Sequence, residues 1–280
     1  MTMKKRHILI VVLGIMLLAV SACGSKKSSN DSSRTNKDKW SEIEKNKKVV
    51  IGLDDTFVPM GFRDESDNIV GFDIDLAKAV FAEYGIDPEF QSIDWSMKEN
   101  ELNNGTIDLI WNGYNITDER KKKVAFSDPY ITSRQELVVM KDNGITSYKD
   151  MKGKILGAQN ASTGQDMIDK NPEVFTDVIA DNEPVLFDTF NEAFIDLKAK
   201  RIDGLIVDNV YANYYIAQQK NPNDYAIVET PFESADFAVG IRKSDKELKI
   251  KIDEAFKKLK DDGKMKKISE KWFGNDQAIQ

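Results

Sequence analysis

The chain has 280 residues, a formal net charge of −7 and a hydrophobic content of 41%. This length and composition predict a buried core and two domains of ordinary size, and the acidic balance argues against nucleic acid or anionic lipid as a partner. The single histidine, His7, and the single cysteine, Cys23, both lie near the N-terminus. The remainder therefore has no residues for a Ser/His/Asp or Cys/His nucleophile or for a His/Cys zinc site, and we expect neither a metal nor a cofactor.

Residues 1–23 have the pattern of a secretory signal. A basic start, Lys4 to Arg6, precedes an apolar run, Ile8 to Val20, that is too short to span a bilayer comfortably. Small residues then lead directly to Cys23, as in a bacterial lipobox, where the cysteine is lipidated and becomes the mature N-terminus. An uncleaved anchor or an incidental cysteine is the alternative. Residues 24–39 are mostly small or polar and predict a flexible tether, so we expect an extracytoplasmic protein held at the cell membrane by its lipid alone.

The first half of the body predicts alternating strands and helices. We expect a short helix near Trp40, a helix that starts at Gly71 with Asp73 as its N-cap, and a helix over Lys98 to Asn104, between strands at Val49 to Leu53, Glu89 to Ser92 and Ile107 to Trp111. This order predicts a parallel sheet covered by helices, in which ligands lie beyond the carboxyl ends of the strands. Phe57, Trp95 and the segment from Asn112 to Arg120 each follow a predicted strand, so all three should line one edge.

The second half repeats the pattern. A strand at Glu136 to Met140 leaves the first unit, and further elements follow: strands at Lys154 to Ala158, Val185 to Phe187, Leu205 to Val207, Tyr225 to Val228 and Phe237 to Ile241, and helices at Gln165 to Asp169, Asn191 to Lys200, Asp245 to Asp262 and Met265 to Phe273. The turn from Gln159 to Gly164 carries hydroxyls and a glycine at a helix start. The halves therefore predict two α/β lobes.

Two charged residues suggest a site for a zwitterion. Arg120 lies where a strand, a turn containing Gly113 and a helix start combine free backbone N–H groups with a guanidinium, which suits a carboxylate. Asp208 ends another apolar run and suits an ammonium. Alternatively, Arg120 is a surface helix residue beside a basic run, and Asp208 caps a helix.

Several blocks in this order resemble the polar amino acid-binding proteins of ABC importers, the glutamine-, histidine- and lysine/arginine/ornithine-binding type. The resemblance runs from about Val49 to Gly274, and its carriers are Gly71 to Ala77, Asn115 to Arg120, Phe126 to Pro129, Ser162 to Gly164, Asp203-Gly204 with Asp208, and Glu270 to Gly274. It implies an α/β, two-lobe, periplasmic-binding-protein-like (type II) clamp of mixed, mostly parallel sheets, with two crossover strands. Lobe 1 would comprise residues 40–138 and 232–280, and lobe 2 residues 139–231.

The resemblance also implies roles for single residues. Arg120 would bind the ligand α-carboxylate, helped by the backbone at Asn115 and by Ser162 or Thr163. Asp208 would bind the α-ammonium together with the carbonyl of Gly113. The ligand side chain would lie between two aromatic rings and touch two polar groups at its far end: Phe57, Trp95, Asp54 and Gln159. Asn115 and Ala161 depart from the family pattern, which commonly has Ser or Thr and Gly there, so side-chain preference cannot simply be transferred.

The main functional prediction is therefore a monomeric, non-enzymatic binding protein that delivers a polar L-amino acid to an ABC permease. Asp54 and the neutral Gln159 favour glutamine slightly, while cystine, arginine and histidine stay open. A carboxylate-dependent enzyme on the same fold is the alternative, although no paired carboxylates face each other across a cleft in the pattern. A sensor ectodomain would need a transmembrane helix after Gly274, and none follows up to Gln280.

Overall fold

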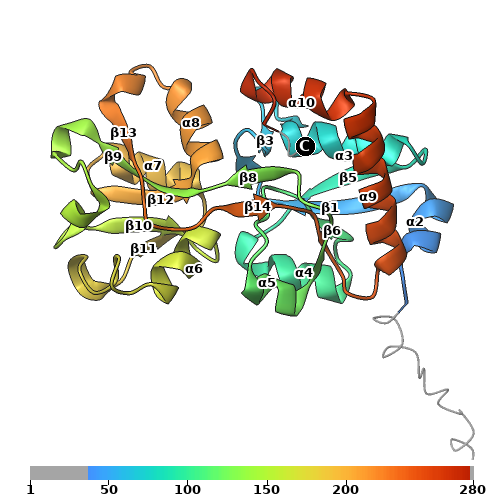
Figure 1. The fold of residues 1–280 in the computed structure, drawn as a ribbon, viewed down its shortest axis with the longest axis horizontal. Helices are drawn as coiled ribbons and strands as arrows, with labels where there is room; N and C mark the ends of the chain where they lie inside the picture. The colour runs from blue at the N-terminus through green and yellow to red at the C-terminus, as the bar shows by residue number, and fades with distance from the viewer. Residues whose placement is uncertain (1–36, 278–280) are drawn as a thin grey trace, which may run out of the picture. The chain divides into compact units, whose positions relative to one another are not determined.

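A computed structural model describes residues 37–277 (Figure 1). The expected signal segment 1–23, its Cys23 and most of the tether 24–39 lie outside the described residues. Within residues 37–277, no helix is both long and apolar enough to cross a membrane.

The first lobe is built on a five-stranded sheet. Its strand order is β5 (Asp87–Ser92), β1 (Lys48–Leu53), β6 (Leu109–Ile110), β15 (Gly240–Ile241), β7 (Ala125–Phe126). β1 is parallel to β5 and β6, whereas β15 is antiparallel to its neighbours. The carboxyl ends of β1, β5 and β6 thus meet at one edge, which is where the following turns place their side chains.

Helices cover both faces of this sheet (Figure 1). α3 (Phe72–Ala82), α9 (Lys246–Asp261) and α10 (Lys264–Phe273) pack together, and α4 (Lys98–Asn104) and α5 (Asp118–Lys123) lie on the other side; α2 (Trp40–Asn46) contacts β1. The C-terminal helices therefore belong to the first lobe. A small antiparallel sheet, β2 (Thr56–Phe57), β3 (Gly61–Arg63) and β4 (Ile69–Val70), follows β1.

The second lobe repeats this plan. Its sheet has the order β11 (Val185–Phe187), β10 (Leu156–Gln159), β12 (Gly204–Asp208), β9 (Gln135–Met140), β13 (Tyr225–Val228). β10 is parallel to β11 and β12, and β9 is antiparallel to β12 and β13. Its helices are α6 (Thr163–Lys170), α7 (Phe190–Lys198) and α8 (Asn209–Ala217), with short 3₁₀ turns η3 (Lys141–Asn143), η4 (Tyr148–Met151), η5 (Ala180–Asn182) and η6 (Pro222–Asp224).

Two strands carry the chain between the lobes. β8 (Ile131–Ser133) and β14 (Ala235–Phe237) pair antiparallel between the two larger sheets. β9 pairs within the second sheet along its whole length, so the first crossing ends before Gln135 and not after residue 138. Phe232 packs against Phe175 in the second core, so the second lobe extends slightly beyond residue 231. Both differences arise because hydrophobic pattern locates strands but not their partners.

Three local expectations differ from the structure. Asp73 is not the N-cap of α3, which is Gly71 with φ 144°. A Cβ at Gly71 would lie 2.2 Å from the carbonyl oxygen of Met60, so only glycine fits there. α8 was not expected, and the predicted strand from Ile107 to Trp111 is reduced to β6. The mixed α/β class and the alternation of elements are confirmed.

Candidate functional site

A cavity between the two lobes is lined by twelve residues. They include all ten residues singled out from the sequence, and the full set is Asp54, Phe57, Trp95, Asn112, Gly113, Asn115, Arg120, Gln159, Ser162, Thr163, Phe190 and Asp208. All but Phe190, the first residue of α7 (Phe190–Lys198), lie at or after the carboxyl ends of β1, β5, β6, β10 and β12, which face this cavity. The topology thus brings together side chains up to 154 positions apart.

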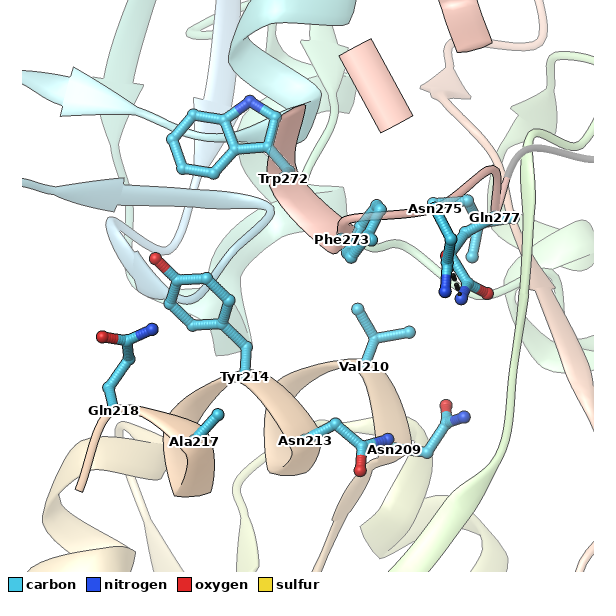
Figure 2. A pocket seen from close by; sticks show the side chains of 11 residues that line it. Asn209, Val210, Asn213, Tyr214, Ala217, Gln218, Trp272, Phe273, Asn275 and Gln277 are labelled. Carbon is cyan, nitrogen blue, oxygen red and sulfur yellow. Dashed lines mark hydrogen bonds between the residues drawn. The ribbon is translucent and has the colours of Figure 1, made fainter. Parts of the chain in front are cut away.

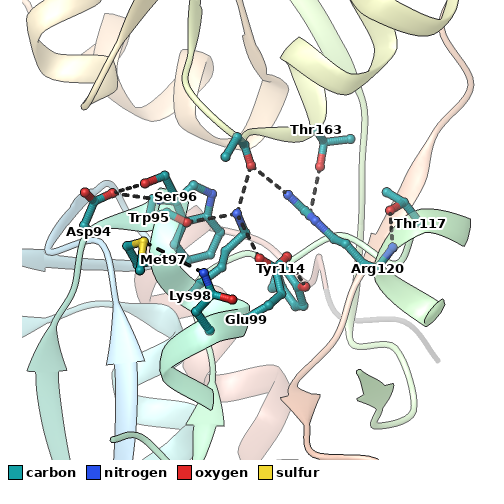
Figure 3. Close-up of polar contacts among 12 residues, drawn as sticks. Asp94, Trp95, Ser96, Met97, Lys98, Glu99, Tyr114, Thr117, Arg120 and Thr163 are labelled. Atoms are coloured by element: carbon teal, nitrogen blue, oxygen red, sulfur yellow. Dashed lines mark hydrogen bonds and ion pairs between the residues drawn. The ribbon is translucent and has the colours of Figure 1, made fainter. Parts of the chain in front are cut away.

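Arg120 is buried and reaches across to the second lobe (Figure 3). Its backbone N–H donates to the hydroxyl of Thr117, the N-cap of α5, at 3.2 Å. Its guanidinium donates to the carbonyl of Asn115 at 3.1 Å, to the hydroxyl of Thr163 at 3.0 Å and to the carbonyl of Ala161 at 3.4 Å. All these acceptors are neutral, so the guanidinium retains its capacity for a charged partner.

Asp208 is the corresponding acidic group of the second lobe. It stands at the N-cap position of α8, but its side chain makes no capping hydrogen bond. Instead the carboxylate accepts from the hydroxyl of Ser133 at 2.7 Å and from the amide of Gln135 at 2.8 Å. Burial raises the pKa of Asp208 to about 6, and these two donors and Arg120 offset only part of that rise. A cation would stabilise its charged form.

A second carboxylate joins the lobes at another wall of the cavity. Asp54 follows β1 and accepts from the hydroxyl of Thr56 at 2.6 Å and, across the cleft, from the side-chain amide of Gln159 at 2.8 Å. Burial is the main cause that raises its pKa. Two aromatic rings lie on this side of the cavity, where Phe57 packs against Phe190 with ring centroids 5.8 Å apart. This wall therefore combines flat apolar surfaces with one buried acid.

Close packing and hydrogen bonds hold the loop after β6 in place. Gly113 has φ 57°, and a Cβ there would lie 2.7 Å from the ring of Phe57. Its N–H donates to Asp73 at 2.7 Å. Asn115 donates to Ser133 at 3.0 Å and accepts from Thr163 at 2.9 Å, so it links the first lobe to a crossing strand and to the second lobe. These contacts fix the loop's backbone at the cavity.

Comparison with known proteins decides the family. The family model described as "Bacterial extracellular solute-binding proteins, family 3" matches residues 49–275. The chain belongs to this family of solute-binding proteins.

Three solved or curated relatives illustrate the similarity. The crystal structure of an ABC uptake transporter substrate-binding protein from Streptococcus pneumoniae with bound histidine is 53% identical, with a TM-score of 0.86 over 87% of this chain and 99% of that one. The arginine-binding extracellular protein ArtP of Bacillus subtilis is 32% identical over 96% of this chain and 98% of its own length. The glutamine-binding protein GlnH of the same organism is also 32% identical, over 99% of this chain and all of its own length.

These relatives confirm the type II clamp and the predicted class of amino acid ABC importer substrate-binding protein. The monomeric state stays a prediction. This solute-binding protein is a substrate-binding component of the amino acid ABC importer class, and the comparisons favour that function over the enzyme or sensor alternative. In the part of the chain that the structure describes, no group of three or more His, Cys, Asp or Glu side chains is placed to hold a metal ion.

Sequence reasoning missed three residues at or beside the site of this solute-binding protein. Phe190 and Asn112 line the cavity, and Lys98 lies behind it with 2% of its surface exposed. Asn112 belongs to the loop that was singled out, and Lys98 follows Trp95 by one helical turn. Phe190 had no local signal, because it reaches the cavity only through the packing of α7 against β2.

A separate groove lies between α8 and the end of α10 (Figure 2). It is lined by Ile131, Asn209, Val210, Asn213, Tyr214, Ala217, Gln218, Trp272, Phe273, Asn275 and Gln277. None of the ten candidate ligand-binding residues lines this groove. The cavity with Arg120 and Asp208 is therefore the candidate site.

Proposed function

We propose that this protein binds the two charged groups of a free amino acid, one on each lobe, and that this closes the lobes around it. The observation that carries the proposal is that Arg120, from the first lobe, and Asp208, from the second, line one cavity. A ligand with only one of these charges can satisfy only one lobe. A zwitterion therefore has a differential affinity for the closed arrangement.

The α-carboxylate is assigned to Arg120. Its guanidinium is buried, and its hydrogen-bond partners are two backbone carbonyls and one hydroxyl. No acidic side chain among residues 37–277 forms an ion pair with it. A planar carboxylate matches the guanidinium's two-pronged geometry, and the neighbouring Ser162 and Thr163 add donors from the second lobe.

The α-ammonium is assigned to Asp208, with the carbonyl of Gly113 assisting. The carboxylate already accepts from Ser133 and Gln135, both uncharged. Its raised pKa reflects a buried charge that these donors compensate incompletely. An ammonium would supply the missing positive charge.

The ligand side chain is assigned to the wall of Asp54, Phe57, Trp95, Gln159 and Phe190. Asp54 is a buried acid whose hydrogen-bond partners, Thr56 and Gln159, are uncharged, so we favour a planar side chain that carries positive charge over the neutral glutamine. Histidine and arginine have such side chains and stack well on aromatic faces. The S. pneumoniae relative has bound histidine, and ArtP is named for arginine. Glutamine and cystine, for which the relatives GlnH and TcyJ are named, are the competing ligands.

The test is a calorimetric panel of the twenty amino acids and cystine. We expect histidine or arginine to bind with a dissociation constant below about 1 μM, and glutamine to bind at least tenfold more weakly. Recovery of the ligand unchanged after prolonged incubation excludes an enzyme. Absence of binding by every member of the panel would contradict the proposed function.

We further infer that the body is tethered outside the cytoplasm by a lipid on Cys23. The support is the lipobox-like sequence before Cys23 and membership in an extracellular solute-binding family. Cys23→Ser should abolish incorporation of labelled palmitate in cells and shift the protein from the membrane fraction to the soluble fraction. Unchanged membrane association of the variant would contradict the anchor.

A further inference from the structure

Lys98 is a buried cation that joins the two lobes without lining the ligand cavity. It is the first residue of α4, and its ammonium nitrogen donates to the carbonyl of Trp95 at 2.9 Å, within the first lobe. The same nitrogen donates to the carbonyl of Ala161, in the second lobe, at 3.0 Å. Figure 3 shows the side chain between the two lobes, beside Arg120.

The turn that Lys98 holds is the one that presents Ser162 and Thr163 to the cavity. Ala161 has φ 54°, a left-handed conformation in a residue other than glycine, and its carbonyl also accepts from Arg120 at 3.4 Å. Two cations of the first lobe therefore converge on one carbonyl. When the lobes separate, both lose this partner and Lys98 becomes accessible to water.

Burial and like charges oppose an ammonium at Lys98 in the closed arrangement, whereas nearby acids and an aromatic ring favour it. On its own helix, Glu99 forms an ion pair with Lys98 at 3.8 Å, through the carboxylate oxygen that does not accept from Tyr114. The Lys98 nitrogen also lies 4.9 Å from the centre of the Trp95 ring, and both contacts favour the charged form. From α5, Arg120 and Lys123 are like charges, and from α6 only Asp166 is opposite. Burial, followed by Arg120, lowers the pKa of Lys98 to about 7.

A neutral amine can make both hydrogen bonds that hold Lys98 in this position. A neutral lysine amine has two N–H groups, and Lys98 has two carbonyl acceptors. Deprotonation would keep both hydrogen bonds, end the cost of burying the charge and remove the repulsion from Arg120, at the expense of the attraction to Glu99 and to the Trp95 ring. In the open arrangement, water solvates the charge and the ordinary protonated form is favoured.

We propose that Lys98 is a positioning residue that fixes the Ala161 turn against the first lobe, and that it releases a proton to solvent when the lobes close on a ligand. The inference rests on the proposed function, because closure is driven by the amino acid. The open form binds more protons than the closed form, so rising pH favours closure through Lys98. Protonation thus opposes ligand binding at this residue, although Lys98 touches no ligand.

The experiment compares full-length wild type with Lys98→Met and with Lys123→Met as a matched control. Lys123 is exposed and carries the same charge near the site. The affinity of wild type relative to Lys98→Met should rise several-fold from about pH 7 to about pH 8.5, whereas the Lys123→Met protein should follow the wild type. Titration of the ligand's own amine affects all three proteins equally and cancels in the ratio.

Calorimetry in buffers of different ionisation enthalpy provides the second readout. At about pH 8 the wild type should release more than about half a proton per ligand bound, and Lys98→Met clearly less. An affinity ratio that is constant or falls with pH, or equal proton release by the two proteins, would overturn the inference. Ligand binding by Lys98→Met shows that the variant folds, and loss of binding by wild type would refute the proposed function instead.

Discussion

The guanidinium of Arg120 donates to the hydroxyl of Thr163 at 3.0 Å, and this bond connects the first lobe to the second. Thr163 in turn donates to Asn115, back in the first lobe, at 2.9 Å. The group assigned to the ligand carboxylate is therefore part of the contact between the lobes. Under the proposed assignment, binding a carboxylate and closing the lobes would involve the same atoms.

Arg120→Lys should weaken amino acid binding although it keeps the charge. A lysine ammonium cannot present two parallel N–H groups to a carboxylate and cannot reach Thr163 and Asn115 together. We expect a loss of about 1.5 to 3 kcal/mol, or roughly 10- to 100-fold in affinity, by calorimetry. Arg134→Lys, at an exposed arginine, is the control and should bind like the wild type. Equal affinities for both variants would remove Arg120 from the site.

Asp208→Asn should abolish a pH dependence that the wild type shows. Burial raises the pKa of Asp208 to about 6, so the folded, ligand-free protein binds a proton there more readily than the unfolded chain does. Through this group, stability increases as pH falls from about 6 toward about 4, while affinity for an ammonium decreases.

The measurement is the binding constant of wild type and variant from about pH 7 down to about pH 5. Wild-type affinity should fall by up to tenfold per pH unit below about 6, and Asp208→Asn should bind weakly throughout. Asp224→Asn, at an exposed acid of the second lobe, should behave as the wild type. A variant with the wild-type pH profile would show that another group controls it.

Asp54→Asn should change which amino acid is preferred. The substitution keeps the shape of the side chain but removes the buried negative charge, so a ligand with a cationic side chain loses its partner. Histidine and arginine should bind at least tenfold more weakly, and glutamine should change less. Asp55→Asn is the control, because Asp55 pairs with Arg63 at the surface. A uniform loss for all ligands would assign Asp54 a structural role only.

Asp73→Ala should destabilise the loop after β6, which contains Gly113. Removing the carboxylate leaves the buried N–H of Gly113 without its acceptor, which costs about 1 to 3 kcal/mol of unfolding free energy. Asp73→Asn keeps an acceptor oxygen and should cost less. Urea denaturation of both variants measures the difference, and equal stabilities would show that the hydrogen bond to Gly113 contributes nothing.

The contrast between Thr117 and Asp73 shows what sequence could and could not predict. Thr117 caps α5 through a residue three positions away, so the helix start beside Arg120 followed from local pattern. Asp73 looked like a cap by the same criterion, but its partner is Gly113, forty residues further on. Long-range hydrogen bonds leave no periodic trace in a sequence.

The same contrast between local pattern and long-range contacts applies to the candidate site. Phe57 and Trp95 follow predicted parallel strands and were expected at one edge because the topology of such sheets places them there. Asp54 and Gln159 were expected at the site only from the resemblance to the family. Phe190 and Lys98 enter from helices, and their position depends on how the lobes meet. The bond between Asp54 and Gln159 likewise depends on that meeting, since each residue belongs to a different sheet.

The most direct test of the central claim is to ask which parts of a ligand close the lobes. Energy transfer between dyes on Lys257→Cys, in α9, and Lys198→Cys, in α7, reports the distance between the lobes in a Cys23→Ser background; both positions are exposed. If histidine is the ligand, it should change the transfer, whereas histamine, which lacks the carboxylate, and imidazolepropionate, which lacks the ammonium, should not at the same concentration. Closure by either analogue at the concentration that suffices for histidine would contradict the account.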